Sequence, residues 1–357
     1  MVTRVLAVDR DRPDPLAIEE AATAISEGRL VAFPTETVYG LGANALDLAA
    51  VARIFEAKER PATDPLIVHI AHIGQLPLVA SRVSPAARKL GLAFWAGPLT
   101  LILPKAAAIP DIVTAGLPNV AVRVPAHRVA RALMEMAGVP VAAPSANRFS
   151  KPSPTTAAHV VADLDGRIDL VLDGGATDIG LESTIVDCSV EPPVVRRPGG
   201  ITLEQLREVV PEVQLQVGRA GSDGPQVSPG QLLRHYAPKA PLTLYEGEAG
   251  AVVVRMAADA RTAVAEGKVV GVLAPEEDLL AIAPLIAAQA RTGRIETRPY
   301  GSRADPARAA QQLFAALRSF DETAVSTILA SSIGAEGLGL AVRDRLFRAA
   351  EGRLRKA

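Results

Sequence analysis

Four basic side chains stand where predicted helices or strands end, which is where binding sites are usually built. Lys58 and Arg60 lie two residues apart at the end of a predicted helix, and Arg123 and Arg197 end two apolar runs. An arginine guanidinium makes parallel hydrogen bonds to a carboxylate or phosphate, and a lysine adds a point charge. The four cations therefore suit anionic ligands, although each one taken alone is better explained as a solvated surface residue.

Hydroxyl and imidazole groups accompany these cations. Thr37 lies in a turn rich in hydroxyls and glycine, His69 lies near the end of a predicted strand, and Ser183 begins another. Such side chains can hydrogen-bond to amino, carboxylate and hydroxyl groups. The structural alternatives are a satisfied histidine on a strand and an ordinary hydroxyl at a strand start.

A third group of polar residues follows the apolar run 139–143, which ends at Ala143. It contains Ser145, Asn147 and Ser153. Small hydroxyls just past a strand end suit contacts to phosphate or ribose. The alternative is helix capping and Asx-turn formation in a loop rich in serine and proline.

Strands and helices alternate irregularly over the first 210 residues and must position these side chains. Apolar runs predict strands at 4–8, 30–33, 66–70, 99–103, 120–124, 139–143, 168–172, 183–188 and 194–197. Helix-start signals and apolar periodicity predict helices at 15–27, 48–58, 85–92, 128–137, 155–164 and 203–210. The pattern predicts an α/β domain with a twisted, mixed sheet over residues 1–210.

Residues 211–241 change character, because they are rich in glycine, proline, serine and other polar residues. This composition predicts a linker or a long functional loop. His235 and Tyr236 are unusual in a passive linker, so we expect a lid that folds over a bound ligand. The alternative is that Tyr236 and Leu232–Leu233 only anchor the linker on the first domain.

Residues 242–357 alternate regularly between strands and helices, which predicts a smaller Rossmann-like domain with an open parallel sheet. Strands are predicted at 242–245, 252–256, 268–274, 295–298 and 327–330, and helices at 258–266, 275–290, 305–319 and 340–355. The glycine-rich piece 334–339 does not match a GxGxxG fingerprint and is interpreted as an ordinary strand-to-helix turn.

Composition excludes several classes of protein. The net charge of -1 predicts no strong general attraction to nucleic acid. Cys188 is the only cysteine, which excludes a disulfide framework and a cysteine-rich zinc site, and its apolar run predicts a buried structural thiol. The N-terminus has no signal-peptide pattern, and no apolar stretch reaches the roughly 18 residues of a membrane span. We therefore expect a soluble, cytoplasmic protein.

Two long motifs carry a specific resemblance. PTETVYGLGANA at 34–45 and KERPATDPLIVHI at 58–70 resemble the signature of the YrdC-type threonylcarbamoyl-AMP synthases. Further family motifs follow in order: GPLT at 97–100 with Ala96 in place of a proline, VAVRVP at 120–125, APSAN at 143–147, ESTIVD at 182–187, RPG at 197–199, SPG at 228–230 and HYAPKAP at 235–241. The motifs spread over roughly two thirds of the chain.

The resemblance implies a YrdC-like fold with a concave active-site face, and a linker that crosses the mouth of that site. It implies a reaction that joins L-threonine, bicarbonate and ATP into threonylcarbamoyl-AMP and pyrophosphate. The implied catalytic residues are Lys58 and Arg60, and the implied threonine pocket is Thr37, His69, Arg123 and Ser183. The implied ATP contacts are Lys58, Arg60, Asp64, Asn119, Ala143, Ser145, Asn147, Ser153, Arg197, His235 and Tyr236. Attack on the α-phosphorus needs positioning and charge stabilisation, so no covalent nucleophile is required.

Mg²⁺ is expected with the ATP. The sequence shows no carboxylate cage; Glu36 and Glu182 are the nearest candidate ligands, and salt-bridged or solvated glutamates explain them equally well. The resemblance also implies that a separate transferase complex uses the product to modify tRNA. Weak direct binding of tRNA by this chain is left open, and no association with a membrane is expected.

A second class of function is a module that binds double-stranded RNA or tRNA on a concave basic face. The isoelectric point near 6.6 and the lack of a base-stacking aromatic set argue against it. A related carbamoyltransferase of hydrogenase maturation carries cysteine zinc fingers, which a chain with one cysteine cannot form.

Overall fold

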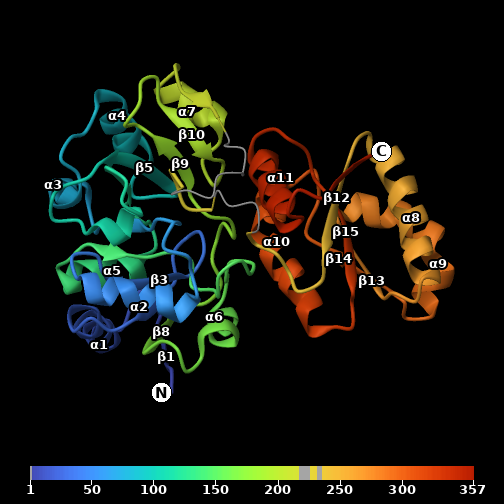
Figure 1. Ribbon diagram of the computed structural model, residues 1–357, viewed down its shortest axis with the longest axis horizontal. Helices are drawn as coiled ribbons and strands as arrows, with labels where there is room; N and C mark the ends of the chain where they lie inside the picture. The colour runs from blue at the N-terminus through green and yellow to red at the C-terminus, as the bar shows by residue number, and fades with distance from the viewer. Residues whose placement is uncertain (1, 217–225, 231–234) are drawn as a thin grey trace. The chain divides into compact units, whose positions relative to one another are not determined.

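The computed structural model describes residues 2–216, 226–230 and 235–357 (Figure 1). The chain divides into two compact units, residues 1–149 with 153–232 and residues 150–152 with 233–357. The sequence predicted boundaries at 210 and 241 instead. The first unit extends further because residues 214–215 form an edge strand and Gln226 donates its backbone N–H to the Thr63 carbonyl at 3.0 Å.

The first unit is built on a mixed sheet, as predicted. Its strands are β1 (Arg4–Ala7), β2 (Val31–Phe33), β3 (Gly40–Asn44), β4 (Ile67–His69), β5 (Leu99–Pro104), β6 (Asn119–Arg123), β7 (Val141–Ala142), β8 (Leu170–Asp173), β9 (Thr184–Asp187), β10 (Val194–Arg197) and β11 (Gln214–Leu215). Over the described residues these eleven strands are ordered β1-β8-β2-β3-β7-β4-β6-β5-β9-β10-β11. Parallel and antiparallel pairs both occur, so the predicted α/β fold with a mixed sheet is confirmed.

Helices cover both faces of this sheet. They are α1 (Pro15–Ser26), α2 (Leu48–Lys58), α3 (Leu76–Val79), α4 (Pro85–Phe94), α5 (Arg128–Ala137), α6 (Ala157–Leu164) and α7 (Leu203–Val209), with 3₁₀ turns η1 (Ile73–Gln75) and η2 (Asp111–Thr114). Successive strand residues point to opposite faces. Ala32 therefore packs in the core formed with α2, α4, α6 and α7, whereas Val31 and Phe33 pack in the core formed with α1 and α5.

One part of the sheet carries polar side chains on one face. In β4, β5, β6 and β9 the residues that face away from the main core form a small separate cluster of Ile67, Ile102, Ala121 and Ile185. His69 and Arg123 lie two residues after Ile67 and Ala121, and Thr100 lies two residues before Ile102 on an antiparallel strand, so all three share this face. Their backbones are neighbours across the sheet, since Arg123 is in register with His69 on one side and Thr100 on the other.

The glycine-rich turn predicted after Phe33 is partly wrong, because Gly40–Asn44 form β3 in the middle of the sheet. The low strand propensity of the glycines in β3 is outweighed by how closely the neighbouring side chains pack there. A Cβ atom on Gly42 would lie 2.8 Å from both the Phe33 ring and Val141, so only a glycine fits between these side chains.

The second unit is a parallel sheet with helices on both faces, which confirms the predicted Rossmann-like fold (Figure 1). Its strands are β12 (Leu242–Glu246), β13 (Val270–Ala274), β14 (Ile295–Pro299), β15 (Thr327–Ser331) and β16 (Leu354–Lys356), ordered β14-β13-β15-β12-β16. Its helices are α8 (Ala249–Ala265), α9 (Glu276–Arg291), α10 (Pro306–Ser319) and α11 (Leu338–Ala349), with η3 (Phe320–Glu322).

Two predicted elements of this unit are wrong. Residues 252–256 are helical within α8, because Glu248 caps its N-terminus and Val252, Val253 and Met256 repeat with a helical period in the core. The last helix ends at Ala349, and the following residues form the edge strand β16 beside β12.

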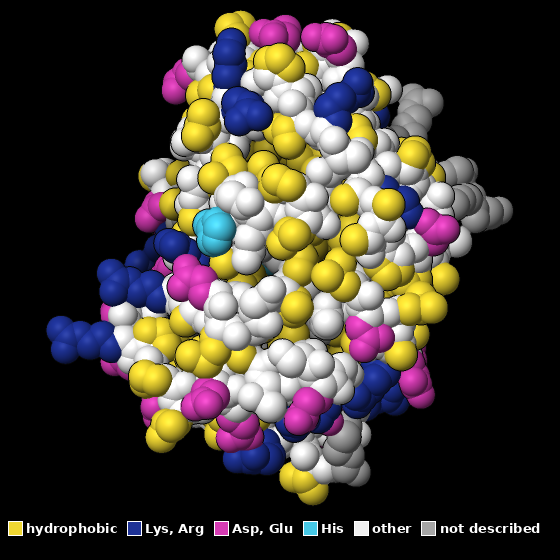
Figure 2. Space-filling model, turned by 90° about the vertical axis from the view of Figure 1, so that its left-hand side faces the viewer, with side chains coloured by type: hydrophobic (Ala, Val, Ile, Leu, Met, Phe, Trp, Pro, Cys, Tyr) yellow, Lys and Arg dark blue, Asp and Glu magenta, His cyan; other side chains and the backbone are white. Residues whose placement is uncertain are grey.

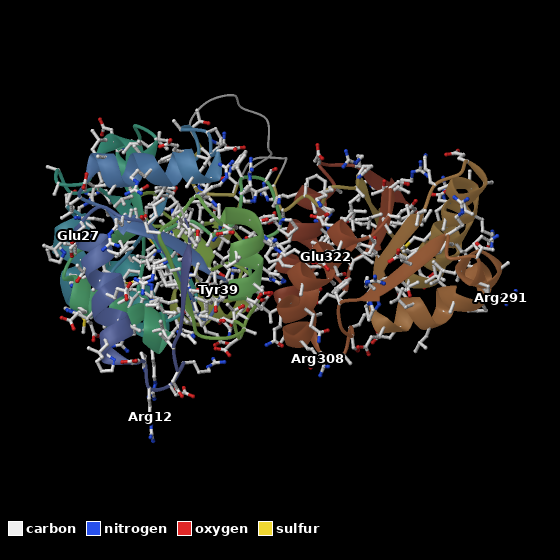
Figure 3. All side chains as sticks on the ribbon, turned by 90° about the horizontal axis from the view of Figure 1, so that it is seen from below. Arg12, Glu27, Tyr39, Arg291, Arg308 and Glu322 are labelled. Atoms are coloured by element: carbon white, nitrogen blue, oxygen red, sulfur yellow. The ribbon has the colours of Figure 1, made fainter. Side chains whose placement is uncertain are left out.

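Charged side chains lie mainly at the surface. Figure 3 shows Arg12, Glu27 and Arg308 projecting outward, whereas Tyr39 lies inside the first unit and donates its hydroxyl to the Gly175 carbonyl at 2.6 Å. Figure 2 shows basic and acidic side chains interspersed on one face, in keeping with the net charge of -1. Cys188 is buried, and burial raises the pKa of its thiol to about 12. None of the helices in the described ranges has the length and apolarity to cross a membrane.

We predict that Gly42→Ala destabilises the protein by about 1–3 kcal/mol, because the new methyl overpacks a filled site. Gly40→Ala in the same strand is the matched control, since its Cβ would meet its neighbours at 3.4 Å or more. Urea unfolding of both variants measures the difference. Equal stability of the two would contradict the packing argument.

Candidate active site

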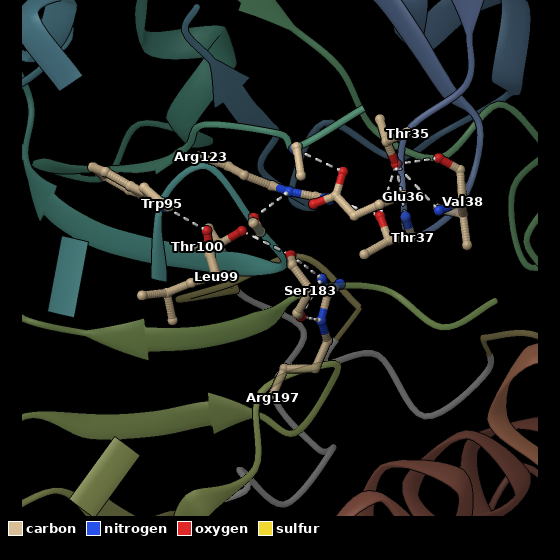
Figure 4. Close-up of polar contacts among 12 residues, drawn as sticks. Thr35, Glu36, Thr37, Val38, Trp95, Leu99, Thr100, Arg123, Ser183 and Arg197 are labelled. Atoms are coloured by element: carbon tan, nitrogen blue, oxygen red, sulfur yellow. Dashed lines mark hydrogen bonds and ion pairs between the residues drawn. The ribbon is translucent and has the colours of Figure 1, made fainter. Parts of the chain in front are cut away.

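Arg123, at the end of β6, has a fixed guanidinium (Figure 4). Its Nη2 donates to the Glu36 carboxylate at 2.7 Å, its Nη1 to the Thr37 hydroxyl at 2.9 Å and its Nε to the Gly97 carbonyl at 3.4 Å. The other Glu36 oxygen accepts the backbone N–H of Ala126 at 3.0 Å. A guanidinium has five N–H groups. Within the described residues two of them have no partner and can bind a ligand carboxylate.

Hydroxyl groups continue from Arg123 along the same face. Thr100 and Ser183 share a hydrogen bond of 2.7 Å between their hydroxyls. Arg197, at the end of β10, donates to the Ser183 hydroxyl at 3.3 Å and to its carbonyl at 3.0 Å. Ser183 thus lies between the polar residues around Arg123 and a second arginine, as Figure 4 shows.

His69 lies beside Arg123 on β4 and is buried. Its Nδ1 has no hydrogen-bond partner in the described structure, and its ring meets the Phe33 ring edge-on at 6.4 Å. Burial, helped by the charge of Arg123, lowers the pKa of His69 to about 3. The imidazole is therefore neutral at physiological pH, and its buried Nδ1 is available to a ligand.

Asp64 marks a second cluster, of three cations. Its carboxylate is fully buried and lies 3.0 Å from Nη2 of Arg60. Burial raises the pKa of Asp64, and the nearby charges of Arg60, Lys58 and Arg197 oppose this effect. The fold therefore brings Arg197 to the Lys58–Arg60 pair, although about 140 residues separate them in sequence.

The two arginines of this cluster are anchored by backbone carbonyls. Arg60 donates to the carbonyls of Asp64 at 3.0 Å and Pro65 at 2.7 Å. Arg197 donates to the carbonyls of Ser183 and, at 3.3 Å, Pro229. These bonds hold the guanidinium groups in place within a nearly dry environment.

Lys58, the last residue of α2, connects this cluster to the serine-rich loop after β7. Its ammonium donates to the carbonyls of Ser145 and Asn147. The Ser145 hydroxyl in turn donates to the Asn147 side chain, and Ser153 donates to Glu182. The structure thus brings the loop predicted for nucleotide binding to the cations.

Ala143 lies at the start of this loop and donates its N–H to the Ile67 carbonyl at 2.8 Å. Asn119 is separated from the cluster. It begins β6 whereas Arg123 ends it, a distance of roughly 13 Å along a strand. Its amide donates to the Ser189 hydroxyl at 3.1 Å.

His235 and Tyr236 belong to the second unit, where Tyr236 packs on α10 and α11. Of the predicted lid, residues 217–225 and 231–234 lie outside the described residues. The described piece 226–230 contacts the first unit through Gln226 and Pro229.

In the described parts of the chain, no group of three or more His, Cys, Asp or Glu side chains could hold a metal ion. Glu36, one predicted magnesium ligand, binds Arg123, and Glu182, the other, binds Ser153. Glu36 and Glu182 therefore do not suit a metal ion that is held by protein ligands alone.

Sequence reasoning missed Thr100 as a site residue and Glu36 as the partner of Arg123. The GPLT motif was a signal for Thr100, because strand alternation places it on the face of Arg123. Gly199 of the RPG motif was a signal of a different kind, for a close approach between two backbone segments. A Cβ atom on residue 199 would lie 2.4 Å from the Glu182 carbonyl oxygen. Only glycine lets this loop approach the backbone that carries Ser183.

Family models match most of the chain. A model described as "Telomere recombination" (Sua5_yciO_yrdC) matches residues 23–199, and one described as "Threonylcarbamoyl-AMP synthase, C-terminal domain" matches residues 201–351. The chain is 44% identical to a threonylcarbamoyl-AMP synthase of Pyrococcus abyssi, over 97% of this chain and 98% of the relative. It is 45% identical to one of Bacillus subtilis, over 94% of both. The crystal structure of P. abyssi Sua5 complexed with L-threonine superposes with a TM-score of 0.90 at 43% identity, covering 99% of this chain and all of that one.

His69 generates a pH-dependent prediction. The unfolded chain binds a proton at this histidine near pH 6.5 and the folded chain does not until about pH 3, so stability falls as pH falls. Between pH 7 and pH 5 the wild type should lose about 2 kcal/mol more than His69→Gln. Urea unfolding at both values measures this loss, with His72→Gln as the exposed control. Equal losses in wild type and His69→Gln would contradict the buried, neutral state.

Proposed function

The chain belongs to the family of threonylcarbamoyl-AMP synthases, and from this premise we propose that it converts L-threonine, bicarbonate and ATP into threonylcarbamoyl-AMP and pyrophosphate. One observation carries the proposal: Ser183 lies between Thr100, the neighbour of the fixed Arg123 across the sheet, and Arg197 of a separate cluster of three cations. A substrate with a carboxylate and a substrate with phosphates would then lie side by side. The relative solved with L-threonine supports the same assignment.

The Arg123 pocket is proposed to bind threonine. The two available N–H groups of Arg123 take the carboxylate, since Glu36 and Thr37 already orient the guanidinium. Thr37, Ser183 and the neutral His69 are proposed to bind the amino and hydroxyl groups of threonine. A neutral imidazole suits this pocket because a second cation would compete for the carboxylate.

The Asp64 cluster is proposed to bind ATP. Lys58, Arg60 and Arg197 hold the phosphates, and the loop from Ala143 to Ser153 contacts the ribose and α-phosphate. His235 and Tyr236 are further ATP contacts in this proposal. Asn119 is a further ATP contact in this proposal, and in the free protein its amide donates to the Ser189 hydroxyl.

Catalysis then rests on positioning and charge. The threonine nitrogen bonds to the bicarbonate carbon with loss of water, and a carbamate oxygen bonds to the α-phosphorus as the bond to pyrophosphate breaks. Lys58 and Arg60 stabilise the negative charge that develops on the phosphates. Mg²⁺ is proposed to bind together with ATP as part of the substrate, and no catalytic step is assigned to the ion. The product would pass to a tRNA-modifying transferase in the cytoplasm.

Release of pyrophosphate tests the proposal, with threonine and bicarbonate omitted in turn. Full turnover should need all three substrates, and mass spectrometry should detect threonylcarbamoyl-AMP. Pyrophosphate release that does not depend on threonine would overturn the proposal. RNA binding that collapses between low and physiological salt, without such turnover, would favour the double-stranded RNA module instead.

Arg123→Lys should raise the threonine KM roughly ten- to hundredfold, because a lysine keeps the charge beside Glu36 but loses the planar fork. The ATP KM should stay within about threefold, since the phosphates bind the other cluster. Steady-state kinetics measure both constants, with the exposed Arg131→Lys as control. An effect on the ATP KM alone would remove Arg123 from the threonine pocket.

Lys58→Met should lower kcat at least about tenfold while threonine affinity changes little, because its charge acts on the phosphates in the transition state. Methionine retains the buried stem of the side chain. Kinetics and calorimetric threonine binding separate the two effects, and the exposed Lys89→Met serves as control. Loss of threonine binding with unchanged kcat would contradict the assignment.

A further inference from the structure

Thr100, on β5 of the first unit, is fully buried, and its hydroxyl has one hydrogen-bond partner among the described residues. That partner is the hydroxyl of Ser183, at 2.7 Å. In the sheet, Thr100 is in register with Arg123 of β6 on one side and with Ile185 of β9 on the other. Ser183 lies two residues before Ile185, so strand alternation places its side chain on the same face. Thr100 therefore lies between Arg123 and Ser183 (Figure 4).

The position of Ser183 is fixed by two further residues of the same unit. Arg197 donates to the Ser183 hydroxyl through Nη2 at 3.3 Å, and to the Ser183 carbonyl through Nε at 3.2 Å and Nη2 at 3.0 Å. The loop at Gly199 packs directly on the backbone of residues 182–184, where a Cβ atom would lie within 2.5 Å of backbone atoms. These contacts fix the backbone and the hydroxyl oxygen of Ser183. Only the direction of its hydroxyl hydrogen is left to be set.

The hydrogen-bonding capacity of the neighbouring groups sets this direction. A hydroxyl donates one hydrogen and accepts two, whereas a guanidinium only donates. Thr100 has a guanidinium on its Arg123 side and an apolar side chain at Ile185, so its hydrogen is directed to Ser183. The Ser183 oxygen then accepts from both Thr100 and Arg197. The hydrogen of Ser183 has no acceptor within the described residues and can be donated to an oxygen atom of a ligand.

We propose that Thr100 is a positioning residue that makes Ser183 a hydrogen donor to the substrate, and that this donor selects an amino acid with a hydroxyl group. The inference rests on the proposed function, in which Ser183 belongs to the threonine pocket. Because both acceptor positions of the Ser183 oxygen are occupied, Ser183 does not accept from the amino group of threonine. The carboxylate is assigned to Arg123, so the Ser183 hydrogen is donated to the threonine hydroxyl oxygen. Thr100 itself touches no substrate.

Thr100→Val tests the proposal, because valine keeps the shape of the side chain without the hydroxyl. Calorimetry on the full chain compares the binding of L-threonine with that of L-2-aminobutyrate, which lacks only the hydroxyl. The substitution should raise the threonine Kd about three- to tenfold, the range of one hydrogen bond, and leave the 2-aminobutyrate Kd within about twofold. Selectivity for the hydroxyl falls because its donor is no longer oriented. Equal effects on the two ligands would overturn the inference.

Two matched variants separate positioning from packing. Thr184→Val is the control, because the buried Thr184 hydroxyl bonds only to the backbone of Ile201 in the described structure, at 2.6 and 2.9 Å. This variant should lower the melting temperature without changing either Kd. Thr100→Ser retains the hydroxyl and should keep the threonine Kd within about twofold of the wild type. A serine variant as weak as the valine variant would assign the effect to packing and remove the positioning role.

A double-mutant cycle with Ser183→Ala tests whether Thr100 acts through Ser183. In the Ser183→Ala background, Thr100→Val should not weaken threonine binding further. Fully multiplicative effects of the two substitutions would contradict the proposed action through Ser183. If Thr100→Val does not fold, as judged by its melting curve, Thr100→Ala takes its place in the cycle.

The failures of the two proposals are distinguishable. A wild-type protein that neither binds threonine nor releases pyrophosphate in its presence refutes the proposed function. An active wild type that prefers threonine to 2-aminobutyrate no more strongly than Thr100→Val does refutes only the positioning role.

Discussion

The cost of burying charge governs the structure of the candidate site. Lys58, Arg60 and Arg197 are almost entirely buried, and removing one ion from water costs several kcal/mol. The fold meets this cost with backbone carbonyls and with Asp64, which sits among the three cations as a phosphate would. Since carbonyls are fixed by secondary structure, the cations are fixed as well. A site of this kind requires little reorganisation when an anion arrives.

The sheet register determines how the two anion-binding regions are spaced. β4, β6 and β5 place His69, Arg123 and Thr100 in one row across the sheet, and the Thr100–Ser183 bond extends this row to the residue before β9. Ser183 thereby contacts both this row, through Thr100, and Arg197. A one-residue slip of β5 would turn Thr100 into the main core and break the connection.

Most of the architecture could be predicted from sequence, because apolar runs and helix caps were clear. α2 and α5 begin and end where expected, since Asp47 caps α2 and Gly138 ends α5. β3 could not be predicted, because Gly42 is required by its neighbours Phe33 and Val141, and Val141 is distant in sequence. The cations were found through motifs. The Glu36–Arg123 pair depends on a tertiary contact that no local pattern records.

A crystal structure of this protein with L-threonine and a nonhydrolysable ATP analogue tests the central claim most directly. The account predicts the threonine carboxylate within about 3.2 Å of the terminal nitrogens of Arg123, with phosphate oxygens at the same range from Lys58, Arg60 or Arg197. Ser183 should lie between the two ligands. A threonine carboxylate bound away from Arg123, or a triphosphate away from the Asp64 cluster, would contradict it.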